Sequence, residues 1–283
     1  MNRPLLAIFP HPDDETFTAA GVLAAAVSRG VPVTVVSATR GEAGESSIGG
    51  LDDSEHLGVI REAELRDAMQ HLGVSDVRFL DYRDSGMEGS SEAAHPRAFV
   101  QAPIKEAAAK LVTLIRAIRP GVILTYGPEG IYGHPDHLHL HHVAMRAVVE
   151  AADPAFKDEA RSEPWQTPSL YFGTAPREDM LAMLDRPNSP LASISANALA
   201  NLGVPRADIT HTIDTRAWAQ QKRAAIAAHT SQTGDGGPLD HIPAEAIEQR
   251  TAWEHFVRAP LPWDPDAASP DLLGQLLAEQ SAS

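Results

Sequence analysis

The chain contains no cysteine. Disulfide bonds, a thiolate nucleophile and a cysteine-ligated zinc site are therefore excluded. Three other common signatures are missing: no G-x-S-x-G motif occurs, and neither a G-x-G-x-x-G motif nor a P-loop follows a predicted strand. These absences disfavour a serine hydrolase and a site for a dinucleotide or a nucleoside triphosphate.

Long apolar runs and basic residues are also scarce. The longest mostly apolar stretch, residues 17–27, is shorter than the roughly 18 residues that a membrane span requires. The apolar residues 5–9 predict a first strand and not a signal peptide, so we expect a cytoplasmic protein without a membrane span. The 38 acidic residues outnumber the 23 Lys and Arg, for a net charge of −15. This balance disfavours nucleic acid as a partner and favours a neutral or weakly charged small molecule.

Strand and helix patterns alternate in the first half of the chain. Strand patterns cover residues 5–9, 31–37, 77–80 and 122–126, and helical patterns cover residues 15–28, 54–72, 102–119 and 135–152. This alternation indicates βαβ units. We therefore predict an α/β fold with a Rossmann-like, mainly parallel sheet flanked by helices.

The second half is less regular. It shows strand patterns at 169–173 and 209–213, helical patterns at 215–229 and 244–258, and a short helical pattern at 270–279. We expect one α/β domain over residues 1–258, followed by a tail over residues 259–283. Within the domain, we expect a core at 1–175 and a C-terminal elaboration at 176–258 that shapes the pocket.

Two His-Pro-Asp turns carry the chemistry of the chain. His11-Pro12-Asp13-Asp14-Glu15 follows the strand pattern at 5–9, and His134-Pro135-Asp136-His137 follows the pattern at 122–126. Ligands of open α/β sheets bind outside the carboxyl ends of the strands. We therefore expect the two turns to face one another across a crevice and to hold a metal ion.

Backbone geometry narrows the choice of ligand atoms in the first turn. Proline favours the first position of a helix, and a helical turn that starts at Pro12 would place His11 and Asp14 on one face. Asp13 would then point elsewhere. In an extended segment, His11 and Asp13 would share a side instead. We favour the helical geometry because acidic residues suit a helix start.

The same logic places His134 and His137 on one helix face. His11, Asp14 and one imidazole of the second turn would make three ligands with an open position for water, as in catalytic zinc sites. Water bound there ionises near pH 7, and Asp13 could accept its proton. We interpret the remaining histidines of this helix as surface or supporting residues, namely His139, His141 and His142.

Other interpretations remain open from the residues alone. Each His-Pro-Asp turn by itself also suits an ordinary helix start. His11, Asp13 and His137 resemble the two-histidine, one-carboxylate triad of Fe(II) oxygenases, although such a site is more natural in an all-β barrel. A non-catalytic sugar-binding protein is a third class.

The motifs resemble those of the LmbE/PIG-L family of metal-dependent N-acetyl sugar deacetylases over roughly residues 4–232. The matching elements are Pro10-His11-Pro12-Asp13-Asp14-Glu15, Arg40-Gly41-Glu42, Arg61-Glu62-Ala63-Glu64-Leu65, Asp84-Ser85-Gly86-Met87 and Tyr132-Gly133-His134-Pro135-Asp136-His137. The last two are especially similar to the mycothiol-pathway branch. That branch includes an N-acetylglucosaminyl-inositol deacetylase and a mycothiol conjugate amidase.

The resemblance implies a zinc-dependent hydrolase that removes the N-acetyl group of a small N-acetylglucosamine-type sugar. Fe²⁺ is the alternative metal, and cleavage of a mycothiol-like S-conjugate is the alternative reaction. The metal ligands implied are His11, Asp14 and His137. The partner expected is thus a small N-acetyl amino sugar, and a homo-oligomer is left open.

The resemblance also implies roles for the remaining site residues. Asp13 corresponds to the general base, a protonated His134 to the stabiliser of the transition state, and Tyr132 to a group that polarises the acetyl carbonyl. Asp136 would orient the imidazole of His134. The substrate contacts implied are Arg61, Asp84 and His229.

Some positions depart from the family pattern or have simpler interpretations. Residue 10 is proline where alanine is more usual, and residue 230 is threonine where arginine is frequent. Arg61 has an alternative interpretation as a solvated charge, Asp84 as a turn residue and Tyr132 as a packing residue. We expect Glu42 and Glu45 at the surface. The tail from residue 259 has no counterpart in the family.

Overall fold

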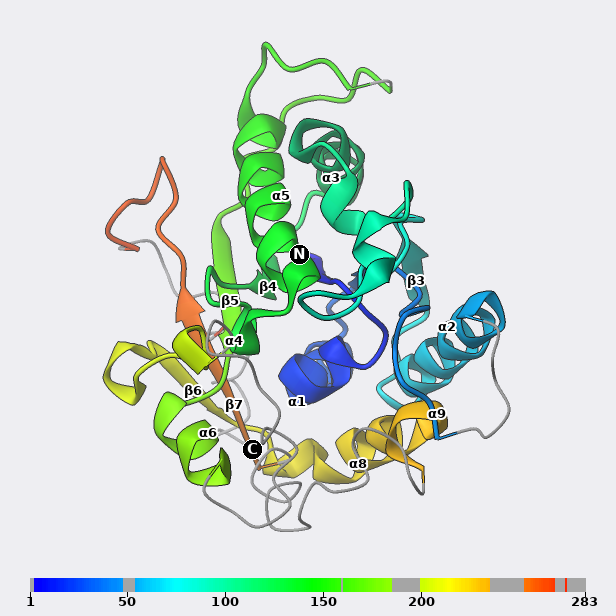
Figure 1. Cartoon of the computed structure of the whole chain (residues 1–283). Coiled ribbons are helices and arrows are strands. Elements are labelled where there is room, and N and C mark those ends of the chain that lie inside the picture. The colour runs from blue at the N-terminus through cyan, green and yellow to red at the C-terminus, as the bar shows by residue number, and fades with distance from the viewer. Residues whose placement is uncertain are drawn as a thin grey trace.

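A seven-stranded sheet forms the centre of the molecule (Figure 1). The computed structural model describes residues 3–47, 54–158, 160–184, 199–234, 252–267 and 273. The strands are β1 (Leu5–Phe9), β2 (Val33–Ser37), β3 (Asp76–Phe79), β4 (Val122–Tyr126), β5 (Ser169–Thr174), β6 (His211–Asp214) and β7 (Trp253–Arg258). They are ordered β3-β2-β1-β4-β5-β7-β6. The first five in that order are parallel, and β7 is antiparallel to both of its neighbours, so the prediction of a mainly parallel α/β sheet is confirmed.

Helices cover both faces of this sheet. The longer ones are α1 (Asp14–Ser28), α2 (Ser54–His71), α3 (Ile104–Ile118), α5 (Pro135–Ala152), α6 (Arg177–Leu184) and α8 (Ala219–Ala228). The short ones are α4 (Gly130–Gly133), α9 (Thr230–Thr233) and the 3₁₀ turns Ser91–Ala94, Phe99–Gln101, Arg206–Asp208 and Arg216–Trp218. Helices α1, α2 and α8 pack in one apolar cluster, and α3 and α5 in the other. Strand β1 contributes alternate side chains to the two clusters, which explains why it is apolar throughout.

The strand order places a crevice beside β1. From β1 the chain proceeds outward to β2 and β3 on one side, and β4 and β5 lie on the other side. Loops that leave the carboxyl ends of β1 and β4 therefore diverge, and this is where open α/β sheets bind ligands. The two His-Pro-Asp turns are these loops.

The predicted helix at 244–258 is wrong at its C-terminal end, because Trp253–Arg258 forms strand β7. The inward-facing side chains of β7 include Glu254 and Arg258, which form buried ion pairs with Lys222 and Asp264. Because charged residues occupy buried positions of β7, the segment lacks the alternation of apolar and polar residues that predicts a strand. Residues 244–251 lie outside the described part of the chain.

Other element boundaries differ by small amounts. The predicted helix at 215–229 begins as the 3₁₀ turn Arg216–Trp218 and continues as α8. The short helix predicted at 270–279 falls outside the described residues except for Leu273. Strands β6 and β7 extend the same sheet, whereas the division into a domain at 1–258 and a tail stays a prediction. Among the helices described, none is both long enough and apolar enough to cross a membrane.

Candidate metal centre

The first His-Pro-Asp turn brings His11 and Asp14 together. Helix α1 begins at Asp14 and not at Pro12, because Asp13 adopts a positive φ of 97° that interrupts the helix. The backbone N–H of His11 donates to Asp14 Oδ2 at 3.0 Å, and His11 Nδ1 lies 3.2 Å from the same oxygen. The pairing of His11 with Asp14 was therefore predicted, but it arises from this left-handed turn.

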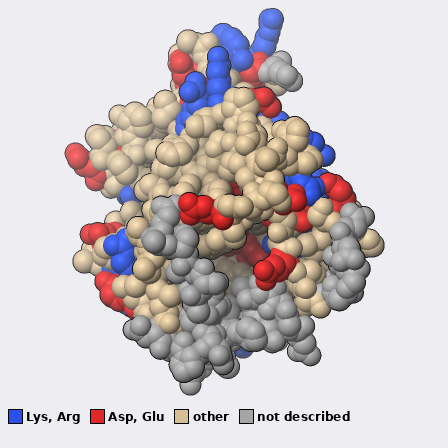
Figure 2. All heavy atoms as spheres, in the orientation of Figure 1, with Lys and Arg blue, Asp and Glu red and all other residues tan. Residues whose placement is uncertain are grey.

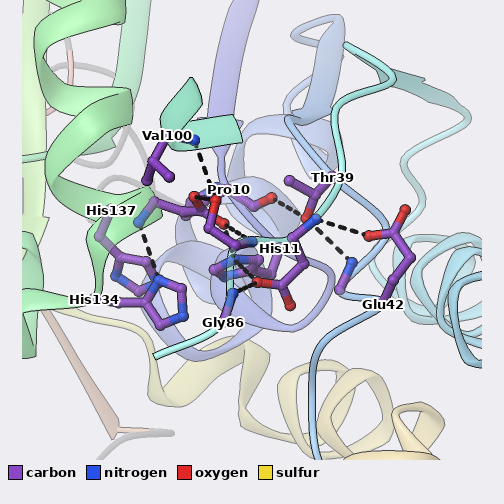
Figure 3. A network of polar contacts seen from close by, with 12 residues as sticks. Pro10, His11, Thr39, Glu42, Gly86, Val100, His134 and His137 are labelled. Atoms are coloured by element: carbon purple, nitrogen blue, oxygen red, sulfur yellow. Dashed lines mark hydrogen bonds and ion pairs between the residues drawn. The ribbon is translucent and has the colours of Figure 1, made fainter. Parts of the chain in front are cut away.

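The second turn meets the first across the crevice. Pro135 occupies the start of α5, as predicted, and His134 precedes it as the cap residue. The ring centroid of His11 lies 4.6 Å from that of His134 and 5.3 Å from that of His137. Each of these three rings offers a nitrogen within 4.8 Å of the other two (Figure 3). The two turns thus form one buried cluster of ligand atoms.

His137 presents an unpaired nitrogen to this cluster. The residue is completely buried, and its Nδ1 hydrogen-bonds to the carbonyl oxygen of Gly130 at 3.1 Å. That bond requires the proton on Nδ1, which leaves a lone pair on Nε2. Nε2 has no hydrogen-bond partner and lies 3.5 Å from Asp14 Oδ1. A buried lone pair beside a carboxylate is the arrangement that a divalent cation would satisfy.

The carboxylate of Asp136 orients His11. It lies 3.1 Å from His11 Nε2 and accepts hydrogen bonds from the backbone N–H and hydroxyl of Ser85. With Nε2 occupied in this way, Nδ1 of His11 is directed toward Asp14. The role of Asp136 in orienting His134 stays a prediction, because the carboxylate itself contacts His11 and Ser85. Asp136 contacts His134 through its own backbone N–H, which donates to His134 Nδ1 at 3.1 Å.

The electrostatics of the cluster favour a bound cation. Burial is the largest effect on His11 and opposes its ionisation, but Asp84, Asp136 and Asp14 outweigh it and raise its pKa well above 6.5. Burial lowers the pKa of His134 to about 3 and that of His137 to about 4, so both imidazoles are neutral at pH 7. The face drawn in Figure 2 is hollowed near its centre, with acidic side chains beside the hollow.

Asp13 and Tyr132 lie at the edge of the cluster. The Asp13 side chain is 17% exposed, and its Oδ2 accepts a hydrogen bond from Arg61 at 3.1 Å. Burial raises the pKa of Asp13 to about 7, against the opposing charge of Arg61. The ring of Tyr132 is half-buried and lies 5.0 Å from that of His137. Tyr132 thus contacts the ring of His137, and Asp13 lies between His11 and Asp14 in the chain.

The three residues expected to contact substrate are all buried. Arg61 is 4% exposed, so its alternative interpretation as a solvated charge is wrong. Asp84 lies 3.4 Å from His11 Nε2 and accepts the backbone N–H of Gly86. His229 packs against α1, where its Nε2 is 3.4 Å from Glu15 Oε1. Their contacts with a sugar stay predictions.

Sequence reasoning missed two supporting residues. Tyr126, the last residue of β4, donates its hydroxyl to Asp14 Oδ1 at 2.8 Å and stacks on the ring of His137. A polar residue at the carboxyl end of a buried strand was the available signal for it. Glu42 is buried, and its carboxylate accepts the backbone N–H of Asp84. The prediction that Glu42 lies at the surface is therefore wrong, whereas Glu45 is exposed as predicted.

The other histidines of α5 lie away from the cluster. His139 and His141 are half-buried and His142 is exposed. The metal-capable groups found in the described part of the chain contain none of them. They accord with the interpretation as surface or supporting residues.

Comparisons with known proteins identify the family of the chain. The family model PIG-L, described as GlcNAc-PI de-N-acetylase, matches residues 6–148. A 1D-myo-inositol 2-acetamido-2-deoxy-alpha-D-glucopyranoside deacetylase of Geodermatophilus obscurus is 40% identical over 253 residues, which cover 84% of this chain and 85% of the relative. The protein of the same name from Rhodococcus erythropolis is 38% identical and covers 97% of this chain and 98% of its own length.

A solved structure extends the likeness to the fold. The N,N'-diacetylchitobiose deacetylase of Pyrococcus horikoshii matches with a TM-score of 0.63 at 19% identity, covering 91% of this chain and 84% of that chain. At this identity the match supports the fold alone. The two sequence relatives and the family model carry the assignment of family. This chain therefore belongs to the PIG-L family of de-N-acetylases, as its motifs suggested.

Proposed function

We propose that this chain is a zinc-dependent hydrolase that removes the N-acetyl group of a small N-acetylglucosamine derivative. The observation that carries the proposal is the buried, unpaired Nε2 of His137, which faces Asp14 beside His11. His11 Nδ1, an oxygen of Asp14 and His137 Nε2 would hold the ion. When bound, it would polarise the acetyl carbonyl and lower the pKa of a water molecule. Two nitrogens and one oxygen also suit Fe²⁺, which is the alternative metal.

Asp13 is the proton acceptor in this proposal. Its carboxylate is partly exposed, and Arg61 accounts for one of its oxygens. A pKa of about 7 suits a group that takes a proton from water and later returns it near neutral pH. We therefore assign to Asp13 both the removal of the proton from the attacking water and its delivery to the departing amine.

His134 and Tyr132 would bind the oxygen of the acetyl group as negative charge develops on it. The Nδ1 of His134 accepts the N–H of Asp136, so the proton of the neutral ring lies on Nε2. Because burial lowers the pKa of His134 to about 3, this ring would act as a neutral hydrogen-bond donor. We propose this neutral form in place of the protonated His134 that the family resemblance implies.

The substrate we propose first is the inositol glycoside for which the relatives are named. A neutral glycoside suits the net charge of −15. A cytoplasmic location and a small N-acetyl amino sugar as a partner are part of the same proposal. Cleavage of a mycothiol-like S-conjugate remains the alternative reaction.

The test is an acetate-release assay with purified protein and a panel of substrates. The panel contains the inositol glycoside, N,N'-diacetylchitobiose, free N-acetylglucosamine and a mycothiol-like S-conjugate, each with Zn²⁺ and, without oxygen, with Fe²⁺. Acetate release from the inositol glycoside supports the proposal. Sugar binding without turnover would instead indicate a non-catalytic binding protein, and metal-dependent oxygen consumption would indicate an oxygenase.

A further inference from the structure

Arg61 connects three separate segments beside the histidine cluster. It lies on α2, and its Nη1 donates to the carbonyl oxygen of Gly41 at 2.9 Å. Its Nη2 donates to the carbonyl oxygen of Pro12 at 2.6 Å and to Asp13 Oδ2 at 3.1 Å. Only 5% of the side chain is exposed. Three of its N–H groups are thus bound by the protein, whereas its Nε is a buried nitrogen without a hydrogen-bond partner.

The loop after β2 is shaped around this guanidinium. Gly41 has a positive φ of 70°, and a Cβ atom placed there would overlap Arg61 Nη1. A Cβ atom on Gly44 would overlap the same nitrogen. The backbone N–H of Gly44 also donates to the Gly41 carbonyl oxygen that accepts from Arg61. The two glycines therefore form a socket into which the Arg61 side chain fits. Any residue with a Cβ atom at position 41 or 44 would displace the guanidinium from it.

Asp13 needs an external support of this kind. Its φ of 97° is in a region that residues other than glycine rarely adopt. Such backbone persists only where the surrounding structure holds it. An aspartate before a helix usually caps it with its own carboxylate, but Asp13 makes no such bond to α1. Arg61 instead donates hydrogen bonds to the carbonyl oxygen of Pro12, which precedes Asp13, and to the Asp13 carboxylate itself.

We propose that Arg61, held in the Gly41–Gly44 socket, is a positioning residue for Asp13, a role separate from the sugar contact that the family resemblance implies for it. This inference rests on the proposed function, because Asp13 is the proton acceptor only there. One of the three hydrogen bonds holds the carboxylate of Asp13, one the peptide that precedes it, and one the loop that forms the socket. Without Arg61, the proposed metal ligands would stay in place, but the Asp13 carboxylate would lose its fixed position.

Kinetics of Arg61 variants separate the two roles. We expect Arg61→Ala to lower kcat by about 10- to 100-fold, since small misplacements of a reacting group have effects of this size. Loss of a sugar contact alone would raise KM and leave kcat unchanged. Arg61→Lys should stay impaired, because an ammonium cannot reproduce the planar fork. Arg66→Ala is the matched control on the same helix. Arg66 is half-exposed and pairs with Glu62, so its variant should keep both constants.

A double-mutant cycle shows whether Arg61 acts through Asp13. In the Asp13→Asn background, Arg61→Ala should cause no further loss of kcat, because residues that act as one unit are not additive. Gly44→Ala should reproduce the loss in the wild type and add nothing in Arg61→Ala, where the overlapping side chain is gone. A raised KM with unchanged kcat in Arg61→Ala would overturn the proposal and assign Arg61 to the sugar.

Hydrogen exchange supplies a measurement that does not depend on catalysis. In metal-free Arg61→Ala, we expect faster exchange of the amides at residues 13–17 than in the wild type and in Arg66→Ala. The rates are compared after correction for any difference in the free energy of global unfolding. Unchanged exchange there would overturn the proposal. If the wild type releases no acetate from any substrate, the proposed function fails, while the exchange result still decides whether Arg61 holds this turn.

Discussion

Replacing Asp13 by asparagine should stabilise the metal-free protein and inactivate the enzyme. Burial raises the pKa of Asp13 from 3.8 to about 7, although Arg61 opposes the rise. The folded state therefore binds this proton more tightly than the unfolded state does. Ionisation of Asp13 consequently destabilises the fold increasingly between about pH 4 and pH 7, and the full cost is present above that range. Asparagine carries no such charge.

The expected size of the effect follows from the pKa. The difference between 3.8 and about 7 corresponds to about 4 kcal/mol. Because the side chain is 17% exposed, solvent screening reduces this figure, and we expect about 2–3 kcal/mol at pH 8. Asparagine has nearly the same shape, and its amide oxygen still accepts the Arg61 N–H. For a chain of this size, the gain corresponds to roughly 4–12 °C in Tm.

Thermal unfolding of both proteins in chelator, from pH 5 to pH 9, measures this gain. The Tm difference should widen as the pH rises and level off above about pH 7. A wild type as stable as Asp13→Asn at pH 8 would refute the claim that the carboxylate is held in a desolvated site. The variant should also keep its metal and lose about 10²- to 10⁴-fold in kcat. Loss of the metal would instead exchange the roles of Asp13 and Asp14.

Three further substitutions test other parts of the site and the fold. His137→Ala should abolish metal binding, so that added Zn²⁺ no longer raises Tm; wild-type metal stoichiometry would move the ligand to His134. Asp136→Asn should weaken metal affinity about 10- to 100-fold because it no longer orients His11, and competition with a chelator would show an unchanged affinity if this is incorrect. Arg116→Ala should lower the free energy of unfolding by about 3 kcal/mol, because the buried guanidinium donates to carbonyl oxygens at the end of α5. Activity per folded molecule should then be unchanged, and a urea titration with equal midpoints would contradict this prediction.

The cluster of histidine and aspartate side chains could be predicted from the sequence because its residues lie in short turns after apolar strands. His11 and Asp14 are three residues apart, and His134 and His137 are likewise three apart. Local geometry therefore limits how each pair can be arranged. The proposal of Asp14 and not Asp13 as a ligand rests on the same local argument, although the observed turn at Asp13 is left-handed and not helical.

The contacts of the supporting residues could not be predicted from local sequence. Asp136 meets His11 across 125 positions of the chain, and Glu42 meets the backbone of Asp84 across 42. Such contacts depend on which strands are neighbours. Strand β7 was missed for a related reason, since Glu254 is buried by its ion pair with Lys222 and not by its own hydrophobicity.

The amino-acid sequence by itself determined strands β1 to β6, the place of the two His-Pro-Asp turns after β1 and β4, and the kinds of donor atom in those turns, because these depend on interactions between residues close in the chain. Only the tertiary structure decided which carboxylate orients His11 and what Arg61 holds. Those contacts arise when β1 pairs with β4 and when α2 packs against the loop after β2. Burial then sets the protonation of Asp13 and His134, since the pKa of each depends on the neighbours that folding assembles around it.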